Sequence, residues 1–155
     1  MKDSQVQMAT EPLDLDKLVA ELSEDDKSAN VVDLGTDIGH VHLHVSDLKS
    51  SEDFYANLLG FDVTQRSYPG ALFLSAGGYH HHIGVNVWAG RGAPPPPTEA
   101  AGLLRTGIHV PTAKALAALE RRFAKNNTQF EVKQNDHIAE RIVRVQSPKD
   151  RKSVV

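Results

Sequence analysis

The run from Ile38 to Val45, IGHVHLHV, alternates between apolar residues and histidine. Successive side chains of a β-strand point to opposite faces, so this run predicts a strand with one apolar and one imidazole face. A second run, YHHHIGVNVW at residues 79–88, combines the same residue types. A period of two divides it into a covered face with Ile83, Val85, Val87 and His81, and an open face with His80, His82, Asn86 and Trp88.

If the two strands lie side by side, imidazoles line the open face of their sheet. Imidazole binds zinc, copper, iron and nickel, and it titrates near neutral pH. The alternative is a set of surface histidines without a task. We expect a functional pocket in which His40 and His42 are candidate metal ligands. Zinc, nickel or copper suits such a patch, and a pocket without any metal is the remaining alternative.

Composition narrows the class of protein. A length of 155 residues supports one domain. The net charge of −3 argues against a nucleic-acid partner. The chain has no cysteine, so His, Asp and Glu are the available side-chain metal ligands. No apolar run is long enough for a membrane span, and the polar N-terminus does not resemble a signal peptide. We therefore expect a cytoplasmic protein.

The order of elements predicts an internal duplication. Residues 1–35 are expected to be a disordered tail plus a short connector helix, with Asp14 as its N-cap. Residues 36–155 form the domain. Its first module, 36–90, has the order β-α-β-β-β, and a proline-rich linker, 91–101, follows. The second module, 102–155, repeats the order, beginning with a strand at 102–110 and ending with only residues 153–155 for its last strand.

Turn and cap residues predict where the elements of both modules begin and end. Ser46 or Asp47 can cap the helix of the first module, and Gly60 can end it. Thr112 can cap the helix of the second module, and residues 147–150 read as a turn.

Four stretches, IGHVHLHVSDL, FYANLLGFDV, ALFLSAGGYHHHIGVNVW and PPPPTEAAGLL, resemble the C-terminal half of bacterial catechol 2,3-dioxygenases. Those enzymes belong to the vicinal-oxygen-chelate (glyoxalase/bleomycin resistance/extradiol dioxygenase) superfamily. The resemblance covers most of residues 12–150. It implies an α+β fold in which two βαβββ modules form a cup.

The resemblance also implies a non-haem Fe(II) centre held by two histidines and one carboxylate, with open positions for a catecholate and O₂. On this resemblance His40 is the first iron ligand. The acid–base histidine comes from the fourth strand, so it is His80 or His82. His137 resembles a further site histidine before the seventh strand.

The chain departs from that pattern in its second module. Arg105 stands at the second ligand position, Val154 at the carboxylate position and Arg144 at an active-site tyrosine. Neither arginine nor valine is an ordinary metal ligand. His109 lies four residues beyond Arg105, about 13 Å along a strand, too far to replace that ligand. Arg105, together with Arg144, instead suits an anionic ligand such as a carboxylate or phenolate. The alternative, favoured for Arg144, is that these side chains face solvent or pair with Glu140 or Asp136.

These observations leave three hypotheses open. The chain is an extradiol dioxygenase-like enzyme, a non-catalytic module that binds a small aromatic or anionic molecule or a metal, or a truncated product. Asn86, Trp88 and His109 join the two arginines as candidate ligand-binding residues. Because the last strand is short, we also expect a second copy to complete the cup as a homodimer.

Overall fold

The structure, a computed structural model, describes residues 6, 11–24, 34–97, 99–103, 105–135, 140–145 and 150–154. Helices and strands mix along the chain, which confirms the expected α+β class. The elements are α1 (Leu15–Ala20), β1 (Val41–Val45), α3 (Leu48–Glu52), η1 (Asp53–Leu59), β2 (Asp62–Gln65), β3 (Ala71–Ser75), β4 (Ile83–Asn86), α4 (Ala113–Lys125), β5 (Phe130–Asn135), β6 (Glu140–Val145) and β7 (Asp150–Val154).

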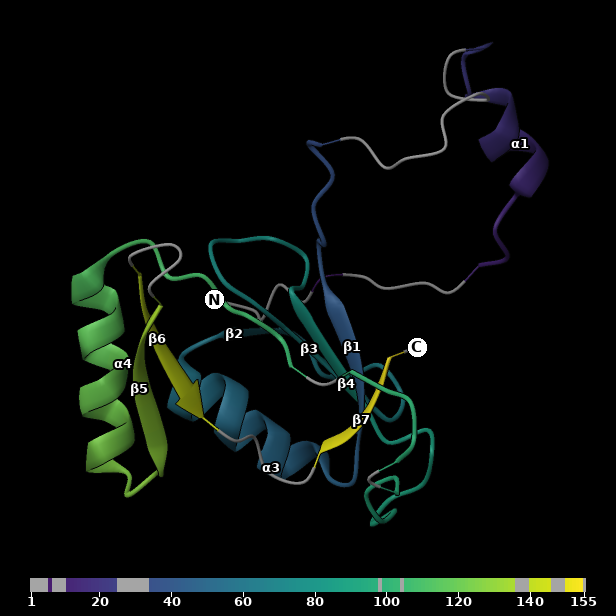
Figure 1. The fold of residues 1–155 in the computed structure, drawn as a ribbon. Coiled ribbons are helices and arrows are strands. Elements are labelled where there is room, and N and C mark those ends of the chain that lie inside the picture. The colour runs from purple at the N-terminus through teal and green to yellow at the C-terminus, as the bar shows by residue number, and fades with distance from the viewer. Residues whose placement is uncertain are drawn as a thin grey trace.

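Five strands form one sheet in the order β2-β3-β4-β1-β7 (Figure 1). β2, β3 and β4 follow one another as antiparallel neighbours. β1 lies parallel to β4, with Leu43 opposite Val85 and His42 opposite Gly84. Parallel neighbours need a crossover connection, and the helical segment of α3 and η1 begins it. β1 is therefore enclosed between β4 and β7, which pairs with it antiparallel.

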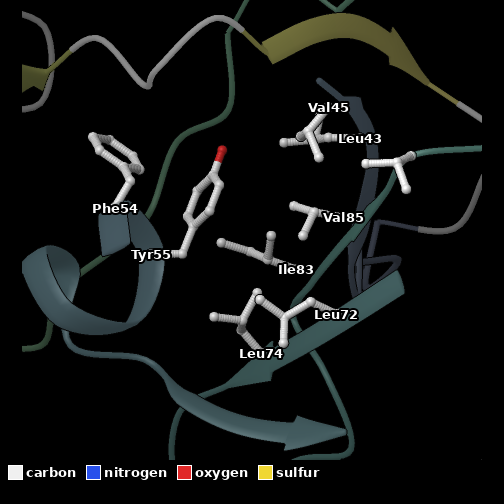
Figure 2. Close-up of a cluster of buried hydrophobic side chains, with 9 residues drawn as sticks. Leu43, Val45, Phe54, Tyr55, Leu72, Leu74, Ile83 and Val85 are labelled. Carbon is white, nitrogen blue, oxygen red and sulfur yellow. The ribbon is translucent and has the colours of Figure 1, made fainter. Parts of the chain in front are cut away.

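The hydrophobic core lies between this sheet and the helical segment. Figure 2 shows Phe54 and Tyr55 of η1 facing apolar side chains of the strands. Burying such side chains stabilises the fold by about 1.5–3 kcal/mol each. The strand residues of the core are Leu43, Val45, Leu72, Leu74, Ile83 and Val85, with Val87 directly after β4. The predicted covered faces are thus confirmed for the apolar residues of both histidine-containing runs.

The helical segment begins and ends as its sequence predicts. The Asp47 side chain accepts a hydrogen bond from the Ser50 amide (2.7 Å), which caps α3. Gly60 ends η1 in the left-handed conformation with φ 95°. The π-helical winding of η1 has no signal in the sequence that we could identify.

The second half of the chain departs from the expected module. α4 forms as predicted, with Thr112 as its N-cap and Phe123 buried. β5 and β6 pair in a separate two-stranded sheet. The strand expected at 102–110 is wrong for the described residues 102, 103 and 105–110, which form neither helix nor strand. A strand needs a hydrogen-bonded neighbour, and both sides of β1 are already occupied by β4 and β7.

The last strand is longer than expected. β7 begins at Asp150, within the stretch expected to be a turn, and it runs through Val154. Val154 lies opposite Leu43 in the register, and Asp150 lies opposite Val45. The C-terminal segment thus completes the sheet that carries the histidine runs.

The connector helix α1 forms where predicted, with the Asp14 side chain accepting from the Lys17 amide. It stands apart from the sheet in Figure 1, and its residues are exposed. In the parts of the chain that the structure describes, no helix has the length and apolar character needed to cross a membrane.

Candidate metal centre

The alternation of β1 sends its histidines to the face opposite the core. Leu43 and Val45 are buried in the core, whereas His42 and His44 are only partly buried. The His42 ring lies over Gly84 of β4, where an added Cβ would come within 2.8 Å of its Cε1 atom. Gly84 therefore provides the space that this imidazole occupies.

The triple histidine does not continue the alternation. β4 begins only at Ile83, and residues 80–82 form a bend. The assignment of His81 to the covered face is therefore wrong. Its Nε2 atom lies 2.9 Å from the Nε2 atom of His42, on the imidazole face. A period of two holds only inside a strand, so it could not place this residue.

His81 is the centre of a ring cluster. It is 6% exposed, and its ring centroid lies 4.5 Å from that of His40 and 4.5 Å from that of His80. The Phe73 ring packs at 5.0 Å on another side. The Nδ1 atom of His81 is buried and has no hydrogen-bond partner among the described residues.

One ring nitrogen from each of His40, His80 and His81 can be chosen so that all three lie within 4.8 Å of one another. Such convergence lets three donors reach one ion after small movements, because nitrogen–metal bonds measure about 2.0–2.1 Å. His40 and His80 are exposed, so this group opens to solvent. The three histidines can therefore hold a metal.

Burial and repulsion between neighbouring imidazoles favour the neutral forms of His81 and His42. Burial, followed by the positive charge of His40 and its neighbours, lowers the pKa of His81 to about 4. Burial and His40 also lower the pKa of His42. Neutral imidazole carries the lone pair that a metal requires.

His82 lies apart from this cluster in its contacts. Its Nδ1 atom accepts from the Ala76 amide (3.3 Å) and lies 3.1 Å from the Ser75 hydroxyl. Because an amide can only donate, neutral His82 carries its proton on Nε2. The described contacts therefore tie His82 to the turn after β3.

Asn86 and Trp88, two candidate ligand-binding residues, take part in a network beside the cluster. The Asn86 Oδ1 atom accepts from the Trp88 amide (3.3 Å) and lies 2.7 Å from the His44 Nδ1 atom. The Trp88 indole donates to the Pro69 carbonyl (3.0 Å) and packs on Gly70. Trp88 thus covers the turn between β2 and β3, and it is 52% exposed.

The second-half candidates do not join the histidines among the described contacts. Arg105 and His109 are exposed and lie outside any strand. The backbone of Arg144 lies in β6, in the other sheet, and His137 lies outside the described residues. Position 154 carries valine, which has no donor atom. The two-histidine, one-carboxylate iron triad that the resemblance implies therefore does not fit these residues.

Sequence reasoning missed two parts of the cluster. Gly84 and Phe73 support the imidazoles of His42 and His81, yet neither carries a donor atom that would single it out. The register of β1, β3 and β4 provides the signal, because it sets Phe73 opposite Gly84 and Gly84 opposite His42. That register became available only with the structure.

Comparisons with known proteins agree with this architecture. A family model described as the glyoxalase/bleomycin resistance protein/dioxygenase superfamily matches residues 37–153. The catechol-2,3-dioxygenase of Bacillus subtilis (strain 168) is 45% identical over 130 residues, which are 83% of this chain and 45% of that protein. The chain thus spans less than half the length of this curated relative.

Two crystal structures share the fold. A glyoxalase family protein from Enterococcus faecalis superposes with a TM-score of 0.56 at 19% identity, covering 76% of this chain and 94% of that one. A glyoxalase/bleomycin resistance protein/dioxygenase from Alicyclobacillus acidocaldarius gives 0.54 at 17%, covering 77% and 87%. They confirm the vicinal-oxygen-chelate architecture expected from the sequence.

Proposed function

Because the chain belongs to the glyoxalase/bleomycin resistance protein/dioxygenase superfamily, we propose that it acts on small aromatic diols as a domain of the catechol 2,3-dioxygenase type. The 45% identity to a catechol-2,3-dioxygenase over 130 residues carries this proposal. The imidazole face, which lies within the matched residues 37–153, supports it.

The chain's own residues suit the handling of an acidic diol. His80 is exposed beside His40, with ring centroids 6.0 Å apart, so a ligand can reach both. We assign His80 the acceptance of a proton from one hydroxyl when no ion occupies it, since the lone pair of a neutral imidazole accepts a proton. His82 is the weaker candidate for this role because Ala76 and Ser75 already engage its Nδ1 atom.

Turnover tests the proposal directly. The protein is purified anaerobically, supplied with Fe(II), and mixed with catechol and O₂. Oxygen uptake together with a ring-opened product is expected, and H80Q is expected to lower kcat by about 10²–10⁴-fold. Absence of both turnover and catechol binding by calorimetry would overturn the proposal.

A second candidate is binding without ring cleavage. The residues at positions 105 and 154 favour it, because arginine and valine stand where the resemblance places a histidine and a carboxylate. On this candidate, calorimetry detects catechol binding whereas oxygen uptake stays at the level of the metal-free sample. The same two measurements therefore separate the candidates.

We also propose a homodimer. β7 is the outermost strand of the five-stranded sheet, and its outer edge pairs with no other strand that the structure describes. An open edge favours pairing with another strand, and a second copy offers the same edge. Light scattering at micromolar concentration is expected to give twice the chain mass, and a monomer contradicts this proposal.

A further inference from the structure

The mismatch between the family triad and this chain raises the question of which residues bind a metal instead. Every nitrogen that converges in the cluster comes from the segment 40–81. Among the described residues, neither a carboxylate nor a second-half side chain belongs to this group. The donor set thus differs from two histidines and one carboxylate.

We propose that His40, His80 and His81 bind one divalent transition metal as an all-imidazole centre built entirely by the first half of the chain. The centre replaces, rather than completes, the triad of the extradiol dioxygenases. Its use on aromatic diols rests on the proposed function, whereas metal binding does not.

The contact with His42 bears on which nitrogen of His81 would bind the metal. The Nε2 atoms of His81 and His42 lie 2.9 Å apart, so one of them donates and the other accepts. If the Nε2 proton of His81 is the donated one, the lone pair of neutral His81 lies on Nδ1. That atom is buried and has no hydrogen-bond partner among the described residues. A buried polar atom without a partner is costly, and coordination would satisfy it.

His42 is then a positioning residue, because it accepts the proton that sets the tautomer of His81. Metal-bound histidines generally donate their other N–H group to such an acceptor. The His42 ring is held between Gly84 and Phe73, whose ring centroid lies 5.8 Å away. His42 is therefore held in place before any ion arrives.

The donors determine which ions suit the site. Three neutral nitrogens without a carboxylate favour the late first-row metals, in the order Fe(II) < Ni(II) < Cu(II) > Zn(II), over Mg(II), which prefers oxygen ligands. Fe(II) is also an imidazole-binding ion, so ring cleavage on such a centre stays compatible with the proposed function. His82 rather than His80 would then accept the proton, because a ligated His80 has no free lone pair. The strongest binding is expected for Cu(II), with Zn(II) and Ni(II) next.

Metal titration of the full chain tests this inference. Each of Cu(II), Zn(II), Ni(II) and Fe(II) is titrated against a chromophoric chelator, the iron under anaerobic conditions. One ion per chain is expected, and X-ray absorption is expected to report three imidazole nitrogens. H40Q and H80Q change exposed residues, and each is expected to weaken Zn(II) binding by at least about 10–100-fold, the loss typical even of supporting residues.

His44 provides the matched control. It lies on β1 beside the cluster but outside the converging group, with Nδ1 engaged by Asn86. H44Q is expected to leave Zn(II) affinity within about twofold. Equal affinity in H40Q, H80Q and H44Q would overturn the inference, as would a stoichiometry far below one. Circular dichroism identifies any variant that fails to fold.

The outcomes also separate this inference from the proposed function. Stoichiometric metal binding without catechol turnover would support the all-imidazole centre and contradict the proposed enzyme activity. H80Q does not separate the two proposals, because His80 is a proposed ligand and also a proposed proton acceptor. Turnover that survives in H40Q, which changes only a ligand, would contradict the centre and support the enzyme activity.

Discussion

Replacing Gly84 by alanine tests whether the space beneath His42 organises the histidine cluster. The new methyl group would lie 2.8 Å from Cε1 and 2.9 Å from Nδ1 of the His42 ring. Contacts this short force the imidazole to move, because the backbone of β4 is fixed by β1 and β3 on its two sides. Movement of that ring breaks its 2.9 Å contact with His81.

Opposing terms determine the size of the effect. Overpacking costs about 1–3 kcal/mol, and losing one hydrogen bond costs about 1 kcal/mol. Alanine also lowers the conformational entropy of the unfolded chain, which stabilises the folded protein by about 0.4–1 kcal/mol. The free energy of unfolding should therefore fall by about 1–3 kcal/mol, which corresponds to about 2–12 °C in Tm for a domain of this size. Zn(II) affinity should fall by about 10–100-fold.

Calorimetric melting and the chelator titration measure the two effects on one sample. Gly107 is the matched control, because its added Cβ would meet no atom within 4 Å. G107A is expected to keep the Zn(II) affinity of the parent and its Tm within a few degrees. A G84A protein that binds Zn(II) like the parent would refute the positioning role of His42.

Three further predictions concern other parts of the chain. Without metal, the pKa of His81 is about 4 in the folded chain against an ordinary 6.5, so the unfolded chain binds a proton on this imidazole first as the pH falls. The free energy of unfolding therefore falls by at most about 3 kcal/mol between pH 6.5 and pH 4. H81F should flatten this pH dependence, measured by urea unfolding. The double variant R105H/V154E should keep the Fe(II) affinity within about twofold of the parent, because the described residues around position 105 form no strand. A tenfold rise in affinity in a chelator titration would contradict this. Gly70 has φ 69° and packs on the one tryptophan ring, whereas Gly77 has the same φ and open space. G70A should therefore shift tryptophan emission and lower the free energy of unfolding by about 1–3 kcal/mol more than G77A.

The sequence was a good guide wherever local chemistry determines structure. Alternation placed Leu43 and Val45 in the core, and the caps at Asp47 and Thr112 marked where α3 and α4 begin. These features depend on neighbours within a few residues of one another. Short sequence motifs also identified the superfamily, since the family match covers residues 37–153.

The remaining errors involve long-range pairing. His81 was misplaced because the bend at 80–82 interrupts the period of two. The strand expected at 102–110 has an apolar pattern, but β4 and β7 occupy both edges of β1, so it cannot pair there. Neither outcome can be read from spacing, since the first depends on where β4 begins to pair with β1 and β3, and the second on which segment pairs with the remaining edge of β1.

The pairing of β1 with β7 has a consequence for the order of folding. Leu43 pairs with Val154, which follows it by 154 − 43 = 111 residues. Synthesis at about 5–20 residues per second separates the two strands by roughly 5–20 s on the ribosome. During most of that interval the edge of β1 that later pairs with β7 is unpaired. The three proposed ligands, His40, His80 and His81, are synthesised before β7. An ion captured then would stabilise the β1–β4 pair by mass action, and the metal would act as a folding nucleus.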